Sequence, residues 1–223
     1  MSEMPEKLLN LIRISDSFFP MGSFTISQGM EQLVGEKLLP KDKLTNVLRA
    51  YMERIWKSFD FQIFSHSLEA AEHNDLEMLT KLDDVCYASK ISEENRSSMV
   101  KMGINLLNAM NFKKGTLGAS YKELAQQEKV HASYPVILAI ASRSMGLDQR
   151  GGISLIYVNL IEVVASLVRM AEIDYIEAQA LLTEAMKDIE LKIGQLSDLN
   201  QSFPLVDIAS MRHESNPNRM FIS

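Results

Sequence analysis

The stretch SDSFFPMGSFTISQGME, residues 15–31, predicts a sharp turn between two helices. Pro20 fixes its own φ angle and favours an extended conformation for the residue before it. Gly22 permits backbone angles that a side chain would forbid, and Ser23 is a good N-cap for a following helix. We therefore expect an ordered elbow here. Three aromatic side chains are expected to pin it to a core: Phe18, Phe19 and Phe24.

The helix expected after the elbow covers residues 24–38 and contains Gly29. A glycine inside a helix costs about 1 kcal/mol relative to alanine, so Gly29 indicates the close approach of another backbone. Apolar residues recur at helical spacing through most of the chain, and no window alternates strictly as a strand would. The expected fold class is all-α. Residues 1–194 should form one bundle-like domain of roughly eight to ten helices.

The last part of the chain, residues 195–223, differs in kind from the rest. It is polar and holds Pro204 and Pro217, with too few apolar residues to fold alone. A segment of this composition commonly orders when it binds a partner. We therefore expect a C-terminal partner-binding tail.

Composition excludes several classes of protein. The net charge is −6 and no dense block of Lys and Arg occurs, which argues against a nucleic-acid-binding surface. The N-terminus lacks the pattern of a secretory signal, and no uninterrupted apolar stretch reaches the roughly 18 residues of a membrane span. We expect a cytoplasmic protein. The single cysteine, Cys86, permits no intramolecular disulfide and is expected to be a buried structural thiol.

The search for catalytic chemistry leaves one alternative open. The glycine and lysine spacing of a phosphate-binding loop is absent, and residues 118–122 lack the last glycine of a serine elbow. A di-metal helical bundle needs two Glu-x-x-His motifs, of which only Glu128 to His131 is present. His66, Glu69 and His73 could share a helix face, although such a face is commonly just solvated. A helical metal-dependent oxidase is the alternative function.

The elbow resembles the signature of the urease accessory protein UreF family, which reads roughly P-V-G-x-F-x-Y-S-x-G-L-E. The matching residues are Pro20, Gly22, Phe24, Ser27, Gly29 and Glu31. Ile26 stands where the family has tyrosine. Residues 94–107 are similar to the family pattern E-x-R-x-x-S-x-x-M-G-x-x-L-L, and residues 211–221 resemble its ending M-R-H-E-T…R-L-F. After Arg169 the chain departs from the family's P-L-G-Q.

This resemblance implies a non-catalytic, homodimeric scaffold. Such a protein binds a second scaffold, UreD (also called UreH), and the pair recruits the GTPase UreG to deliver nickel to the urease apoprotein. No tightly bound cofactor is implied. Transient nickel is expected in the complex, and His213 is a weak candidate contact for it. A solvated pair of His213 and Glu214 on the tail is the favoured interpretation. Whether GTP hydrolysis is stimulated or restrained stays open. The implied partner-binding residues are Pro20, Gly22, Phe24, Ser27, Gln28, Gly29, Glu31, Arg212, His213, Glu214, Arg219 and Phe221.

Overall fold

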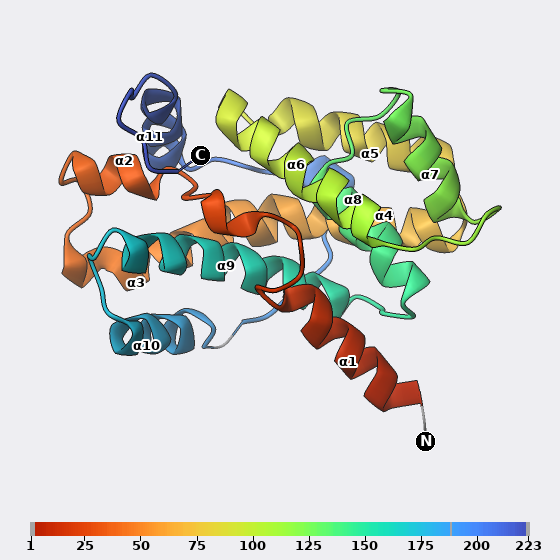
Figure 1. The fold of residues 1–223 in the computed structure, drawn as a ribbon, viewed down its shortest axis with the longest axis horizontal. Helices are drawn as coiled ribbons and strands as arrows, with labels where there is room; N and C mark the ends of the chain where they lie inside the picture. Colours follow the sequence, from red (N-terminus) through yellow and green to blue (C-terminus); the bar gives the residue numbers. More distant parts are fainter. Residues whose placement is uncertain (1–2, 188, 222–223) are drawn as a thin grey trace.

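A computed structural model describes residues 3–187 and 189–221, without the side chains of Glu3 and Phe24. The described residues form helices and connecting loops with no strand, which confirms the all-α prediction (Figure 1). Helices α1 to α10 lie within residues 1–194, and α11 lies in the tail. The α-helices are α1 (Glu3–Ser15), α2 (Met30–Gly35), α3 (Leu44–Tyr51), α4 (Phe61–Glu72), α5 (Leu76–Ser89), α6 (Glu93–Ala109), α7 (Leu117–Gln126), α8 (Tyr134–Ser144), α9 (Gly151–Arg169), α10 (Tyr175–Ala185) and α11 (Pro204–Glu214). Shorter elements are η1 (Ser23–Thr25), η2 (Lys41–Lys43), the π-helix η3 (Met52–Asp60) and η4 (Leu196–Asp198).

Helix α8 forms the centre of the core, since every residue from Tyr134 to Ser142 is buried. It packs most extensively against α4 and α6, and also contacts α9. Its apolar run over residues 136–141 explains this position, because a helix that is hydrophobic on all sides must be enclosed on all sides. Helix α1 projects from the body at one end, and α11 lies beside α2 at the other (Figure 1).

Close contact between α6 and the start of α8 depends on Gly103. A Cβ atom at this position would overlap the carbonyl oxygen of Ala132, a backbone atom that no rotamer change can move. We expect Gly103→Ala to destabilise the protein by roughly 1–3 kcal/mol, the usual cost of overpacking, despite alanine's higher helix propensity. Urea unfolding measures this change. Gly35→Ala is the control, because no atom lies within 4 Å of the Cβ it would add; equal behaviour of the two variants would contradict the close packing.

The long helix α9 crosses the molecule beneath the elbow. Its length and composition alone would suit a membrane span, but 67% of that 18-residue window is buried inside the protein. The glycine pair at residues 151–152 does not separate two helices, because both glycines belong to the first turn of α9. They are needed there for packing, since a Cβ at Gly152 would meet the ring of Phe61.

The elbow differs from its predicted form. Gly22 has φ 81°, as a special turn requires, but it is followed by the short 3₁₀ segment η1 rather than by a long helix. The chain then runs extended at Ile26 and turns again at Gly29, which has φ 82° and precedes α2. Gly29 is therefore the N-cap of a short helix and not an interior residue. The Ser23 side chain makes no capping hydrogen bond, because Gly22 occupies the cap position.

The aromatic residues of the elbow also differ from the prediction. Phe19 is buried, as expected, but Phe18 is 95% exposed. The Phe24 side chain lies outside the described part of the structure. The turn explains the difference, because the Phe18 amide donates to the Asp16 side chain at 2.6 Å and the Phe19 amide bonds to the Asp16 carbonyl. Neighbouring side chains then point in different directions.

Several local predictions are confirmed. Asp75 and Ser92 cap α5 and α6, and each side chain accepts a hydrogen bond from a backbone N–H three residues later. Cys86 is buried, and burial raises the pKa of its thiol. The chain stays helical through Phe59 and Asp60, since the π-helix η3 runs directly into α4.

The tail is a structured part of the fold. Helix α11 packs against α2 and α6, with Val206, Ala209 and His213 buried beneath it. The expectation that the tail orders only on binding a partner therefore differs from the structure. Polar composition suggested too little core for folding, but this helix uses a core that the rest of the chain supplies.

Candidate functional site

The tail and the elbow meet at Gly29. A Cβ atom here would lie 2.8 Å from the Ser210 Oγ atom and 3.3 Å from the Val206 carbonyl oxygen, both on α11. Only glycine leaves room for this approach, and its φ of 82° suits glycine as well. The predicted close approach of another backbone is confirmed, and the backbone concerned belongs to the tail.

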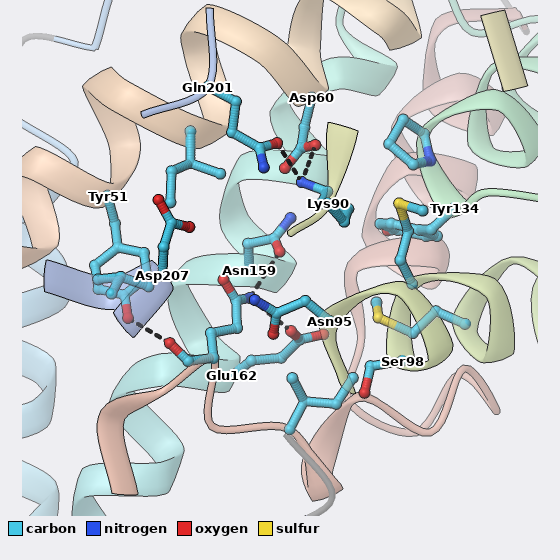
Figure 2. Close-up of a pocket in the computed structure, with 17 residues that line it drawn as sticks. Tyr51, Asp60, Lys90, Asn95, Ser98, Tyr134, Asn159, Glu162, Gln201 and Asp207 are labelled. Carbon is cyan, nitrogen blue, oxygen red and sulfur yellow. Dashed lines mark hydrogen bonds and ion pairs between the residues drawn. The ribbon is translucent and has the colours of Figure 1, made fainter. Parts of the chain in front are cut away.

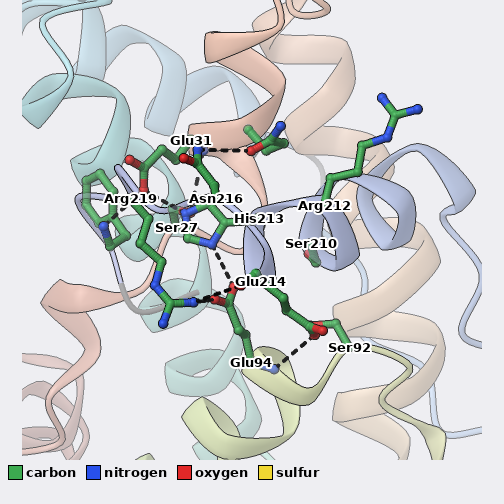
Figure 3. Close-up of polar contacts among 12 residues, drawn as sticks. Ser27, Glu31, Ser92, Glu94, Ser210, Arg212, His213, Glu214, Asn216 and Arg219 are labelled. Carbon is green, nitrogen blue, oxygen red and sulfur yellow. Dashed lines mark hydrogen bonds and ion pairs between the residues drawn. The ribbon is translucent and has the colours of Figure 1, made fainter.

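His213 joins three segments of the chain at this junction (Figure 3). Its side chain is 0% exposed. Its Nδ1 atom lies 2.6 Å from Glu94 Oε2 on α6, and its Nε2 atom lies 2.8 Å from Glu31 Oε2 on α2. One ring nitrogen thus faces each of the two carboxyl groups. The geometry is that of a buried imidazole held between two carboxyl groups.

Glu31 also holds the end of the tail. Its Oε1 atom accepts a hydrogen bond from the Met220 amide at 2.6 Å, and its Oε2 atom accepts one from the Phe221 amide at 2.9 Å. Burial raises the pKa of the Glu31 carboxyl, but the hydrogen bonds from Met220, His213 and Phe221 outweigh it, and the net pKa is lowered. The contacts that lower this pKa stabilise the folded protein fully at pH values above the pKa of the carboxyl in the unfolded chain. This stabilisation is lost as the pH falls through the lower pKa of the folded protein.

Arg219 and Phe221 complete the junction. The Arg219 guanidinium pairs with Glu94, and its side chain is 45% exposed. The Phe221 ring is buried, with the Arg169 guanidinium carbon 4.3 Å from its centroid at the end of α9. Such a cation–π contact stabilises by roughly 0.5–1 kcal/mol where it is partly exposed. The tail is therefore fixed at two successive points after α11.

We define the tail clamp as Glu31, Glu94, His213, Arg219 and Phe221. Three of the other predicted partner-binding residues adjoin it: Ser27, Gly29 and Glu214. The Ser27 Oγ atom accepts from the Glu31 amide at 3.5 Å, and Glu214 Oε1 accepts from the Glu94 amide at 3.3 Å. The structure thus brings together most residues that the sequence motifs singled out, although the elbow and the tail are nearly 200 residues apart.

Four of the predicted residues do not join the tail clamp. Pro20 is exposed, and Gly22 lies near Asn105 of α6. Gln28 is directed away from the tail clamp and bonds to Asn159 and Glu162 of α9. Arg212 lies on the outer side of α11 and pairs with Glu36 at 2.8 Å. These residues belong to other surfaces or to the interior.

The residues of the oxidase alternative are dispersed. His66 Nε2 lies 3.0 Å from the Gly194 carbonyl, and His73 Nδ1 lies 2.9 Å from the Glu69 carbonyl. His131 stacks on Tyr87 with ring centroids 3.8 Å apart. Within residues 3–187 and 189–221, no group of three or more His, Cys, Asp or Glu side chains could hold a metal ion. No donor set for a di-metal centre is therefore assembled in this part of the chain.

Two residues of the site were not predicted from the sequence. Glu94 is part of the tail clamp, and Arg169 packs on the ring of Phe221. Glu94 is the first residue of the E-x-R-x-x-S match, and Arg169 ends the α9 match, so the motifs contained a signal for both. Their role appears only when α6, α9 and the tail are seen side by side.

The fold and the tail clamp define an all-α protein whose C-terminal tail is docked on its N-terminal elbow. The profile of the UreF family matches residues 40–186, and the chain belongs to this family. The elbow and tail lie outside those residues, but full-length relatives cover them. Urease accessory protein UreF of Bacillus sp. (strain TB-90) is 26% identical over 97% of this chain and 99% of its own length. That of Actinobacillus pleuropneumoniae serotype 5b (strain L20) is 25% identical over 96% and 97%, and that of Trichodesmium erythraeum (strain IMS101) is 26% identical over 99% and 98%.

Proposed function

We propose that this protein is a non-catalytic scaffold of urease maturation that acts in the cytoplasm. With the scaffold UreD (UreH), it would recruit the GTPase UreG and support the insertion of nickel into the urease apoprotein. Family membership and the relatives' name, urease accessory protein, support this role. The observation that carries the proposal is the docked tail, whose clamp consists of the residues that the family motifs share.

The outer face of α11 is the proposed contact for the scaffold partner. Leu205, Ile208 and Met211 are exposed and recur every three residues, so they form one apolar stripe on the helix. Their opposite face is held against α2 and α6. An apolar stripe on a fixed helix favours docking into a groove of a partner, because it presents anchors at helical spacing.

The end of the tail and the elbow are the proposed contact for the GTPase. Arg219 is half exposed and lies beside Glu94, and Met220 is 67% exposed and lies beside Glu31. Arginine offers a planar fork of donors that suits a carboxylate of a partner. Nickel is proposed as a transient guest of the complex. Both ring nitrogens of His213 contact carboxylates in the docked tail, so His213 would be free to bind nickel only after the tail is released.

Recovery of the tagged full chain from its native cell tests the proposed function. The expected result is co-purification of a GTPase and a second scaffold protein, and a metal content well below one per chain. A chain that is recovered alone with stoichiometric iron or manganese would instead favour the oxidase.

Replacing Arg219 by alanine is expected to weaken GTPase recruitment and to leave the fold and the scaffold complex intact. The expected loss of affinity is about 30-fold, which corresponds to about 2 kcal/mol. Calorimetric titration of the GTPase against the assembled scaffold complex measures it. Arg150→Ala is the control. Arg150 comes just before the first residue of the 19-residue α9, about 28 Å from Arg169, the last residue of this helix, which lies against the tail. Equal affinities of the Arg219 variant and wild type would remove Arg219 from the interface.

A homodimer is also proposed, through the side of the molecule where α1 meets α9 and α10. A groove of about 740 Å³ lies there, lined by apolar residues that include Ile12, Ile153 and Tyr175. The adjoining Leu8 and Leu9 of α1 are exposed. Such a large apolar surface commonly marks an interface.

Light scattering at micromolar concentration is expected to give twice the mass of the chain. Ile12→Asp should give the monomer mass, because it places a charge in the groove. Leu205→Asp, on the outer face of α11, should leave the dimer intact and weaken scaffold binding instead. A monomeric wild type would refute the dimer, and a dimeric Ile12 variant would refute its location.

A further inference from the structure

A partly enclosed cavity with several polar residues in its lining lies between α6, α8, α9 and the tail (Figure 2). Its volume is about 70 Å³. Gln201 and Asp207 of the tail line it together with Tyr134 of α8 and with Asn159 and Glu162 of α9. The cavity is separate from the tail clamp and takes no part in the function proposed above.

Glu162 is the most unusual group in this cavity, because it is a carboxyl on a largely apolar helix and is only 2% exposed. Its Oε2 atom accepts a hydrogen bond from Gln28 Nε2 at 3.0 Å, whereas its Oε1 atom has no protein partner among the described residues. Burying a charged carboxylate without a paired cation is costly, and such a group normally takes up a proton instead.

The cation that lines the cavity does not neutralise Glu162. The Lys90 ammonium lies 2.7 Å from Asp60 Oδ1 and 2.9 Å from Gln201 Oε1, so it is paired elsewhere. The other acidic groups that line the cavity are Asp207 of α11 and Tyr51 of α3. Neither side chain can carry a positive charge, so neither can neutralise Glu162; burial raises the pKa of both, which favours their neutral forms.

Tyr134 supplies a second unpartnered group. Its side chain is 3% exposed, it lines the same cavity, and its hydroxyl has no protein partner among the described residues. A buried donor or acceptor left unsatisfied costs about 1–3 kcal/mol. Two such groups, on neighbouring helices around one cavity, indicate a shared ligand that can both donate and accept hydrogen bonds.

We propose that this cavity binds a cluster of ordered water molecules that connects Glu162 Oε1 to the Tyr134 hydroxyl and holds Glu162 as the neutral acid. A buried water molecule needs roughly 10–15 Å³ of this kind of volume and two to four polar partners. The cavity provides room for several, with the amides of Asn159 and Asn95 as further partners. Glu162 then supports the elbow from inside, because it holds Gln28, whose Oε1 atom accepts from the Trp56 Nε1–H at 3.2 Å.

A crystal structure of the full chain that resolves bound water tests this proposal. The expected result is at least one water within hydrogen-bond distance of both Glu162 Oε1 and the Tyr134 hydroxyl, or a short chain of waters between them. Tyr134→Phe should lose the water next to the ring. A direct Glu162–Tyr134 hydrogen bond, a dry cavity or density with the coordination of a metal ion would each overturn the proposal.

Infrared spectroscopy in solution gives a second readout that does not depend on crystals or on the Tyr134 variant. The difference spectrum between wild type and Glu162→Gln at neutral pH should contain the C=O stretch of a protonated carboxylic acid. Glu123→Gln, at an exposed position on α7, should not remove that band. A carboxylate band in place of the acid band would show that Glu162 is ionised and would overturn the proposal.

Discussion

Replacing His213 by alanine is expected to destabilise the docked tail by about 3 kcal/mol. The change removes the donor that Glu31 and Glu94 share and leaves two carboxylates facing one another in a closed site. Breaking a buried ion pair by removing one partner costs roughly 3–5 kcal/mol, and the lower end applies because Glu31 keeps two backbone donors and Glu94 keeps Arg219. Urea unfolding measures the loss, and proteolysis near residues 195–203 should report the released tail.

The neighbouring residue provides a matched control. Arg212 is on the same helix and also pairs with a glutamate, Glu36, but both side chains are on the surface. Exposed pairs of this kind contribute little, so Arg212→Ala should leave the unfolding midpoint almost unchanged. If the two variants lost stability to the same extent, the contacts of His213 with Glu31 and Glu94 would not be what holds the tail.

Replacing Glu162 by glutamine is expected to stabilise the protein increasingly as the pH rises. Burial raises the pKa of Glu162 to about 8, partly offset by the hydrogen bond from Gln28. The folded protein therefore keeps this proton to about pH 8, whereas the unfolded chain releases it near the ordinary value of 4.5. As the pH rises between those two values, the release of this proton favours the unfolded state. The free energy of unfolding therefore falls by up to 1.36 kcal/mol per pH unit.

Glutamine removes the titration and keeps the shape of the side chain. The variant should gain roughly 3 kcal/mol over wild type near neutral pH, and this advantage should shrink towards pH 4.5 and level off above pH 8. Urea unfolding across this pH range measures the difference. Glu123→Gln should show no such trend, because Glu123 is exposed. A constant difference between wild type and the Glu162 variant would show that Glu162 does not keep its proton in the folded state.

The helical fold class is the part of the structure that the sequence predicted well. Apolar spacing indicated helices through most of the chain, and local side chains such as Asp75, Ser92 and Asp174 cap three of them. These signals are local, because a cap or an apolar stripe depends on residues within a few turns of each other. The elbow was predicted less well. A bend was expected at Gly22, but the second turn at Gly29 forms because α11 must approach there, and that contact comes from a distant segment.

The candidate site was predicted in its members but not in its contacts. The motifs pointed to Glu31, His213, Arg219 and Phe221. Spacing alone could not show that Glu31 binds His213 and the Phe221 amide, or that Arg219 pairs with Glu94 instead. Gln28 was grouped with them because it is adjacent in sequence, but the turn at Gly29 directs it to Glu162 in the interior.

By itself, the sequence determined that this protein is all-helical, where most of its helices lie, and that it resembles the UreF family. These properties follow from local periodicity, capping and motif. The tertiary structure alone decided that the tail is docked, that Glu94 completes the tail clamp, and that Glu162 is enclosed without a cation. The physical reason is that burial and charge pairing depend on which segments meet in space, and those segments are separated by up to about 190 residues along the chain.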